Sequence, residues 1–270
     1  MTVTESRFEQ LTYGSDRLDR LIAAIGEGAL ERERTGERPF AAIDLVRRER
    51  LGALRVPRGD GGGGASLREL FAVVIALATV DVNVAHIRRG HFAHVEERLR
   101  LDAGERQRVT ELALSGAIVG NASTELGSTP AGAFTWKTRL THDGDAFLLN
   151  GTKYFTTGTL YADYAEVLAL VPTDRTGVTV LDDWDGMGQR ATGTGTATFE
   201  NVAVAPDDGA IRTARHRQRA AAGVPVGCLL PAVRDRTRGR RAARAPRGRG
   251  RARAPAGAQL HVGADAVSSG

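Results

Sequence analysis

The sequence predicts an α+β fold, in which a helical N-terminal domain is followed by a β-barrel-like middle domain and a basic tail. Apolar residues recur at three- and four-residue steps over about the first 116 residues, which is typical of amphipathic helices. From Ala117 the apolar period changes to two, as in half-buried strands. Helices followed by strands, without βαβ alternation, favour separate helical and sheet modules. We therefore expect a helical domain over 1–116, a β-domain over 117–211 and a disordered tail over 212–270.

The helical domain is expected to contain five helical segments, at about 6–33, 39–46, 66–77, 82–101 and 102–114. Ser66, with Glu69 three residues later, predicts a capping box at the start of the third segment. His91 and His94 share a face of the fourth segment. Because a third ligand at matching spacing is absent, we interpret them as residues of a polar face and predict no metal site. The glycine-rich run at 52–64 is predicted to be a loop without a phosphate-binding role, because no Gly-Lys-Ser/Thr follows it.

The β-domain is expected to contain strands at 117–121, 134–141, 147–157, 164–171, 178–181 and 197–204. Asn150-Gly151 lies between two β-prone runs and predicts a two-residue hairpin turn inside the third segment. The strand after that turn would present Tyr154 and Thr156 on one face, and Phe155 and Thr157 on the other. An aromatic ring beside a hydroxyl suits a flat, hydrogen-bonding heterocycle. The alternative is a hairpin whose aromatic residues fill a core.

The net charge of +5 is the sum of two unlike parts. Residues 212–270 hold 14 Arg, no Lys and two Asp, a net charge of +12, which leaves −7 for the rest of the chain. The acidic body therefore lacks the charge signature of a nucleic-acid-binding protein. The single cysteine, Cys228, excludes an intrachain disulfide, and no apolar run is long enough to cross a bilayer. We expect a soluble cytoplasmic protein with no membrane partner.

The basic tail holds too little apolar surface to offset the entropy of ordering it, so we expect disorder. One interpretation is an Arg/Gly-rich segment that binds nucleic acid. Another is translation out of register from about residues 205–215, because the chain uses Arg 35 times and Lys twice, as a GC-rich gene would.

Three motifs in order point to a family. They are Thr124-Glu125-Leu126-Gly127, then LNGTKYFTTG (149–158), then GQRATGTGTATFENVAV (188–204). Over about residues 7–208 the chain resembles the acyl-CoA dehydrogenase superfamily, and most closely its branch of flavin-dependent monooxygenases typified by dibenzothiophene monooxygenase. The resemblance implies a flavin cofactor, FMN or FAD, and a middle β-domain of the acyl-CoA dehydrogenase type.

The resemblance also implies cofactor-binding roles for three residues. Phe155 matches the aromatic residue that lies along the isoalloxazine ring. Thr157 matches the hydroxyl residue near the reactive N5 edge of the ring, and Thr124 matches the threonine on its pyrimidine side. The ring system offers a π-face to the aromatic side chain and edge acceptors to the hydroxyl groups.

In the monooxygenase branch, two further positions act on oxygen and one on the substrate. By resemblance, Asn121 and Thr156 would hydrogen-bond the oxygenated flavin, and Trp184 would wall the substrate cavity. The expected reaction is oxygenation of a small apolar compound that contains sulfur or nitrogen, with reduced FMN supplied by a separate flavin reductase. Members of the superfamily form homo-oligomers, which we expect of an intact protein.

Two departures from the family pattern bear on these expectations. The motif continues as Leu126-Gly127-Ser128-Thr129-Pro130, which weakens the case for FAD and an acyl-CoA substrate, although an FAD-dependent acyl-CoA dehydrogenase remains an alternative. The C-terminal four-helix bundle of the superfamily is not recognisable, so its catalytic glutamate or histidine has no counterpart; His216 and His261 lie in the tail. This loss predicts uncovered apolar faces, poor solubility and weak flavin retention. A catalytically dead module with a nucleic-acid-binding tail is the alternative from another class.

Overall fold

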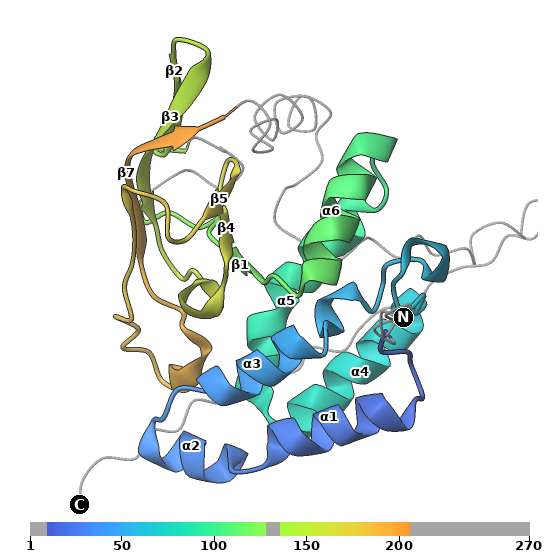
Figure 1. Cartoon of the computed structure of the whole chain (residues 1–270). Helices are drawn as coiled ribbons and strands as arrows, with labels where there is room; N and C mark the ends of the chain where they lie inside the picture. Colours follow the sequence, from blue (N-terminus) through green and yellow to red (C-terminus); the bar gives the residue numbers. More distant parts are fainter. Residues whose placement is uncertain (1–9, 128–135, 206–270) are drawn as a thin grey trace, which may run out of the picture. The chain divides into compact units, whose positions relative to one another are not determined.

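The computed structural model describes residues 10–127 and 136–205 (Figure 1). All of these residues belong to one compact unit. The expectations for the 212–270 tail, for Cys228 and for Ser128 to Pro130 therefore lie outside the described residues. Within the described part, the chain has the mixed helix and sheet build that the sequence predicts.

The helices lie between residues 16 and 115, and their bounds refine the five expected segments. In chain order they are α1 (Asp16–Gly26), α2 (Ala29–Thr35), α3 (Phe40–Arg48), the short 3₁₀ helices η1 (Leu51–Ala53) and η2 (Arg58–Asp60), α4 (Leu67–Val80), α5 (Val82–Arg98) and α6 (Ala103–Ser115). A single helix over 6–33 is wrong. Ser15 caps α1 by accepting a hydrogen bond from the backbone N–H of Leu18, and Gly28, at φ +68°, separates α1 from α2.

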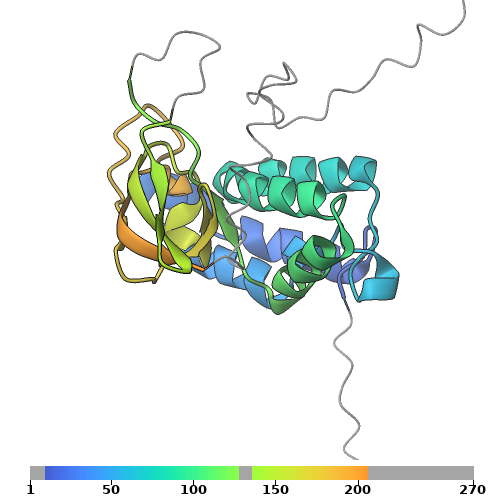
Figure 2. The ribbon, with the colours of Figure 1, turned by 90° about the horizontal axis from the view of Figure 1, so that it is seen from above.

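The predicted capping box at the start of α4 is confirmed. The Ser66 hydroxyl accepts from the Glu69 N–H, and the Glu69 carboxylate accepts from the Ser66 N–H, as a capping box requires. Asp102 similarly accepts from the Glu105 N–H at the start of α6. Helices α1, α3, α4 and α5, whose ribbons are seen from above in Figure 2, bury one apolar cluster. Its fully buried members include Ile25, Ile43 and Leu77.

His91 and His94 correct the prediction of a polar face. Their exposed fractions are 0% and 1%, because this side of α5 packs against the strand that follows α6. The Nδ1 atom of His91 accepts a hydrogen bond from the Val119 N–H at 3.3 Å. Two buried imidazoles give no hydropathy signal that separates them from a solvated polar face, so the periodicity alone was misleading.

The strands form two sheets among the described residues, and no closed barrel is found there. They are β1 (Val119–Asn121), β2 (Arg139–Asp143), β3 (Ala146–Lys153), β4 (Tyr164–Glu166), β5 (Leu170–Pro172), β6 (Val178–Val180) and β7 (Ala197–Val204), with the 3₁₀ helices η3 (Thr159–Tyr161) and η4 (Arg190–Thr192) between them. The first sheet has the order β1-β4-β5, in which β1 and β4 are parallel. The second has the order β2-β3-β7-β6 and is antiparallel throughout (Figure 1).

The predicted Asn150-Gly151 hairpin is wrong. β3 runs straight through this pair, and the hairpin turn lies upstream at Gly144, where φ is +59°. Gly151 sits instead at a bulge in the pairing of β3 with β7, where an added Cβ would lie 2.5 Å from the Thr138 Oγ1 atom. The Asn150 side chain makes two hydrogen bonds to Asn201 of β7. A bulge and a turn share the same local sequence, and pairing with distant strands decides between them.

The predicted alternation of residues 154–157 is also wrong, because β3 ends at Lys153. Phe155 takes a left-handed conformation with φ +56°, and the chain turns there. Thr156 and Thr157 are consequently both buried, while the side chain of Phe155 stays partly exposed.

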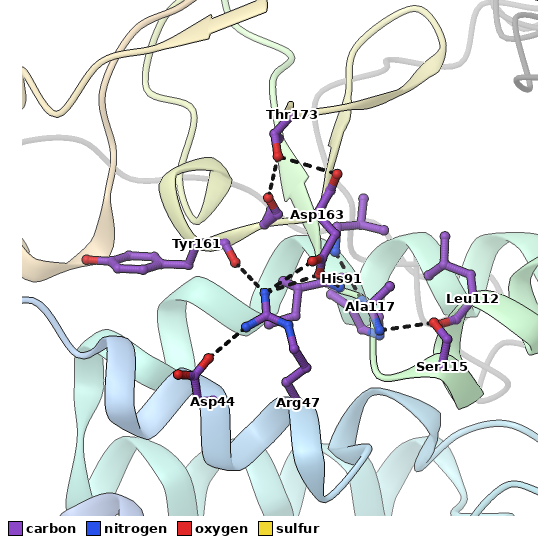
Figure 3. Close-up of polar contacts among 12 residues, drawn as sticks. Asp44, Arg47, His91, Leu112, Ser115, Ala117, Tyr161, Asp163 and Thr173 are labelled. Carbon is purple, nitrogen blue, oxygen red and sulfur yellow. Dashed lines mark hydrogen bonds and ion pairs between the residues drawn. The ribbon is translucent and has the colours of Figure 1, made fainter. Parts of the chain in front are cut away.

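Polar contacts join the helices to the first sheet at the start of β1 (Figure 3). The Arg47 guanidinium of α3 donates to the Tyr161 carbonyl at 3.1 Å and to the Asp163 carboxylate at 3.2 Å. The same carboxylate accepts from the Ile118 N–H at 2.7 Å. The register of the residues that lead into the candidate site is thereby tied to α3.

Candidate functional site

A cavity of about 380 Å³ opens between the end of β3 and the segment that leads into β7. Its wall is formed by aromatic residues, by carboxylates and by small or hydroxyl residues: Tyr154, Phe155, Trp184, Asp183, Asp185, Gly186, Thr194, Gly195 and Thr196. The rings of Phe155 and Trp184 meet edge to face, with centroids 5.9 Å apart and an interplanar angle of 87°. The cavity volume lies within the range of small-molecule sites in proteins.

Phe155 is held on the cavity wall by strained backbone. A positive φ is uncommon for a residue other than glycine and marks a position that the surroundings over-determine. The next residue supplies that constraint, because Thr156 donates from both its N–H and its hydroxyl to the Gly195 carbonyl, at 3.0 and 2.9 Å. Thr156 is fully buried, and its hydroxyl proton is used inside the protein.

A chain of three hydroxyl groups lies behind the cavity. Thr157 and Thr194 are 3.0 Å apart at their Oγ1 atoms, and Thr194 and Thr192 are 2.6 Å apart. Thr157 is buried and does not line the cavity, but its partner Thr194 does. Thr157 can therefore influence a ligand in the cavity only through its hydrogen bond to Thr194.

Asn121 is the last residue of β1 and Thr124 follows that strand, and both are tied to the same region through the backbone. The Asn121 N–H donates to the Thr157 carbonyl at 3.3 Å, and the Tyr154 N–H donates to the Thr124 carbonyl at 2.9 Å. The Asn121 Oδ1 atom accepts from the Ser123 hydroxyl. Neither Asn121 nor Thr124 lines the cavity, and Thr124 is exposed.

The segment that carries Trp184 is fixed from both sides. The Asp183 carboxylate accepts from the N–H and the hydroxyl of Thr196, both at 2.7 Å, and the Trp184 indole donates to the Gly188 carbonyl at 3.0 Å. Gly195 lies so close to this segment that an added Cβ would be 1.9 Å from the Leu181 carbonyl oxygen. A side chain at position 195 would push the two cavity walls apart.

An ion pair is buried directly beside these segments. The Lys153 Nζ atom lies 2.7 Å from the Glu125 Oε1 atom, with 2% of the lysine side chain and 9% of the glutamate side chain exposed. Burial raises the pKa of Glu125, but hydrogen bonds from Lys153, Thr138 and Lys137 outweigh it and lower that pKa to about 2. Burial lowers the pKa of Lys153, and Glu125 opposes that shift.

The structure thus brings all six predicted site residues into one hydrogen-bonded region, but only Phe155 and Trp184 of them line the cavity. Sequence reasoning missed other wall residues, notably Tyr154, Thr194 and Thr196. The alternating TGTGT run at 192–196 was the available signal, since each of its residues is small or carries a hydroxyl. This run leads into the strand β7. A dinucleotide-binding fingerprint would instead lead into a helix, so the run is not such a fingerprint.

Comparison with known proteins identifies homologues of this chain. No protein-family model matches the chain. Dibenzothiophene monooxygenase from Rhodococcus erythropolis is 33% identical over 198 residues, which are 67% of this chain and 47% of that protein. The probable FMNH2-dependent monooxygenase SfnC from Pseudomonas putida is 31% identical, over 68% of this chain and 48% of SfnC. The homologues of this chain are dibenzothiophene monooxygenase-like flavin enzymes with the acyl-CoA dehydrogenase type of fold.

Solved structures agree with this assignment. The crystal structure of FMN-bound TdsC from Paenibacillus sp. A11-2 matches with a TM-score of 0.64 and 30% identity, over 72% of this chain and 52% of TdsC. The resemblance inferred from the three sequence motifs is therefore confirmed. The chain spans about half the length of the relatives that it matches.

Residues 10–127 and 136–205 contain neither a metal-binding cluster nor a membrane-spanning helix. No group of three or more His, Cys, Asp or Glu residues there could hold a metal ion. The helices of the same residues are each too short or too polar to span a bilayer.

Proposed function

We propose that this chain belongs to an oxidoreductase that uses reduced FMN and O2 to oxygenate a small apolar compound containing sulfur or nitrogen. One observation carries the proposal. Phe155 is held at positive φ on the wall of a cavity of about 380 Å³, edge to face with Trp184, in a chain whose homologues are flavin monooxygenases. A strained aromatic residue on a cavity wall is expected where a flat ligand is bound.

The residues present fit an isoalloxazine ring. Phe155 offers a half-exposed aromatic face, and Thr194 offers a hydroxyl that Thr157 and Thr192 hold in place. We propose that Phe155 packs along the ring, that Thr157 acts at its N5 edge through Thr194, and that the exposed Thr124 faces its pyrimidine side. The backbone N–H groups of Tyr154 and Thr156, on either side of Phe155, are already hydrogen-bonded within the protein. The fold therefore sets the position of residues 154–157 before a ligand binds.

Reduced FMN supplies two electrons, by which one oxygen atom of O2 is transferred to the substrate and the other leaves as water. The protein has to orient the substrate and exclude water. Trp184 is proposed to wall the substrate side of the cavity, fixed there by its bond to Gly188. Asn121 is proposed to donate its side-chain amide N–H toward the reacting oxygen. For Thr156 the same role would require its hydroxyl to leave the Gly195 carbonyl.

The partners and compartment follow from this chemistry as proposals. Reduced FMN would come from a separate flavin reductase, as the FMNH2 dependence in the name of the SfnC relative suggests. The intact protein is proposed to be cytoplasmic and homo-oligomeric, in line with the single cysteine and with the family.

The proposal is tested by titrating the full chain with FMN and then assaying oxygenation. Dibenzothiophene, the compound named for the Rhodococcus relative, serves as the first substrate, with reduced FMN regenerated by an added reductase. We expect saturable FMN binding and a product that carries oxygen from O2. Bleaching of bound flavin by an acyl-CoA, without an oxygenated product, would contradict the proposal and indicate a dehydrogenase.

A further inference from the structure

The buried ion pair between Glu125 and Lys153 has no assigned role in the reaction. Lys153 is the last residue of β3, and its ammonium group lies 4.3 Å from the centroid of the Trp136 ring as well as 2.7 Å from Glu125. The Glu125 carboxylate also accepts from the N–H groups of Lys137 and Thr138, at 2.6 and 3.0 Å. One carboxylate therefore joins three separate parts of the chain.

The position of this pair relative to the candidate cofactor residues is what gives it significance. Glu125 directly follows Thr124, and Lys153 is followed by Tyr154 and Phe155. Between them, the Tyr154 N–H donates to the Thr124 carbonyl at 2.9 Å in an isolated β-bridge. Two consecutive cross-links, one of backbone and one of side chains, thus set the separation of Thr124 from Phe155.

A buried ion pair suits such a task better than an apolar contact. Either charge alone would be strongly unfavourable in this place, so the two segments are stable here only when both groups meet. An apolar contact would tolerate sliding, because its energy depends on buried area and not on direction. The low pKa of Glu125 keeps the carboxylate ionised at neutral pH.

We propose that Glu125 and Lys153 are positioning residues of the flavin site, which hold Thr124 and Phe155 at the separation that the isoalloxazine ring requires without contacting the ring. The inference rests on the proposed function, because it assumes that FMN binds at residues 154–157. Neither side chain lines the cavity. Their effect on the cofactor would therefore be transmitted through the residues that follow them in the chain.

The competing explanation is that the pair merely stabilises the fold. The chain offers a matched control in Arg55 and Glu96, another partly buried ion pair with a 2.7 Å separation. Arg55 lies between η1 and η2, and Glu96 belongs to α5. The pair is thus in the helical part, and neither residue lines the cavity. Removal of either pair should lower the melting temperature, but only disruption of the pair between Glu125 and Lys153 should weaken FMN binding.

The experiment compares FMN affinity, measured by flavin fluorescence, with thermal unfolding in the full chain. K153M and E125Q should each weaken FMN binding by roughly tenfold or more, since displacement of a binding group by about 1 Å has effects of this size. R55M should lower the melting temperature while leaving FMN affinity within about twofold of the wild type. K153R, which keeps the charge, should recover part of the affinity.

Each outcome decides the matter. If K153M and E125Q bind FMN as tightly as R55M does, the positioning role is wrong while the proposed function stands. If the wild-type chain binds no FMN, both are overturned. If K153M does not fold, E125Q decides, because its carbonyl oxygen still accepts hydrogen bonds from the backbone N–H groups of Lys137 and Thr138.

Discussion

Phe155 has a positive φ, which is unfavourable for every residue with a side chain, and its large apolar ring is partly exposed. Replacement by alanine keeps the strain and removes the ring, while replacement by glycine removes both. We expect F155G to be more stable than F155A by about 1 kcal/mol, since glycine adopts positive φ without a steric penalty. Both variants should bind FMN more weakly than the wild type.

Thermal unfolding and FMN titration of the two variants check this prediction. Equal stability of F155A and F155G would contradict the strained conformation. Unchanged FMN affinity in both would mean that the ring does not contact the cofactor.

His91 predicts how stability depends on pH. Burial lowers the pKa of His91 well below 6.5, and the neighbouring positive Arg88 and the imidazole of His94 add to the effect. The neutral ring is the form that accepts from the Val119 N–H. Below about pH 6.5 the unfolded chain binds a proton at this position that the folded chain does not, so folding stability falls as the pH falls.

The expected fall is up to about 1.4 kcal/mol per pH unit for one such proton. Urea unfolding at pH 7.0, 6.0 and 5.0 measures it in the wild type and in H91Q, which should show a shallower dependence. An H91Q variant as sensitive to pH as the wild type would contradict a buried neutral histidine.

At the scale of the element, β3 depends on one glycine where the sequence indicates a turn. An alanine at position 151 would place its Cβ 2.5 Å from Thr138 Oγ1 and 2.7 Å from Thr138 Cα, at a φ of +149°. We expect G151A to lower the free energy of unfolding by about 1–3 kcal/mol from overpacking, in addition to its backbone strain. The control is G144A in the true hairpin turn, where no atom lies within 4 Å of the added Cβ and strain alone remains, about 1 kcal/mol. Chemical denaturation measures both, and equal losses would contradict a bulge packed against Thr138.

The bounds of a helix or strand can be predicted from sequence when the interactions that set them involve residues close together in the chain. The starts of α4 and α6 were predicted, because a capping residue and its partner lie three residues apart. The β7 bounds were predicted because an alternating run follows the TGTGT segment at 192–196 and stops before Pro206. The Asn150-Gly151 turn was not predictable, because the pairing of β3 with β7, some fifty residues away in sequence, decides between turn and bulge.

The same limit applies to the candidate site. Motif resemblance identified the strip at 154–157 and Trp184, and the structure places Phe155 and Trp184 together on the cavity wall. The contribution of Thr194 depends on a contact with Thr157 across 37 residues, which no local pattern contains. The burial of Thr156 follows from the turn at Phe155, which strand periodicity treats as a straight strand.

At the scale of the whole molecule, hydrogen bonds and an ion pair join the helical core to the sheet core. Whether the two cores unfold cooperatively can therefore be tested. Asp163 accepts from the Ile118 N–H and from Arg47, so D163A removes a partner from both (Figure 3). We expect a loss of about 1–3 kcal/mol, mainly because an N–H group is left unpaired. Asp44 is the other carboxylate that contacts Arg47, and it is exposed. D44A should therefore lower the free energy of unfolding by less than about 1 kcal/mol.

The two tryptophans, Trp136 and Trp184, both lie in the sheet part, so tryptophan fluorescence reports the sheets while circular dichroism at 222 nm reports mainly the helices. Coincident denaturation curves are expected for the wild type and for D44A, because a two-state domain loses both signals together. In D163A the two curves should separate, since the residues entering β1 are no longer tied to α3. Coincident curves in D163A would show that the packing of α5 against β1 suffices to couple the two cores. The polar junction would then contribute stability without cooperativity.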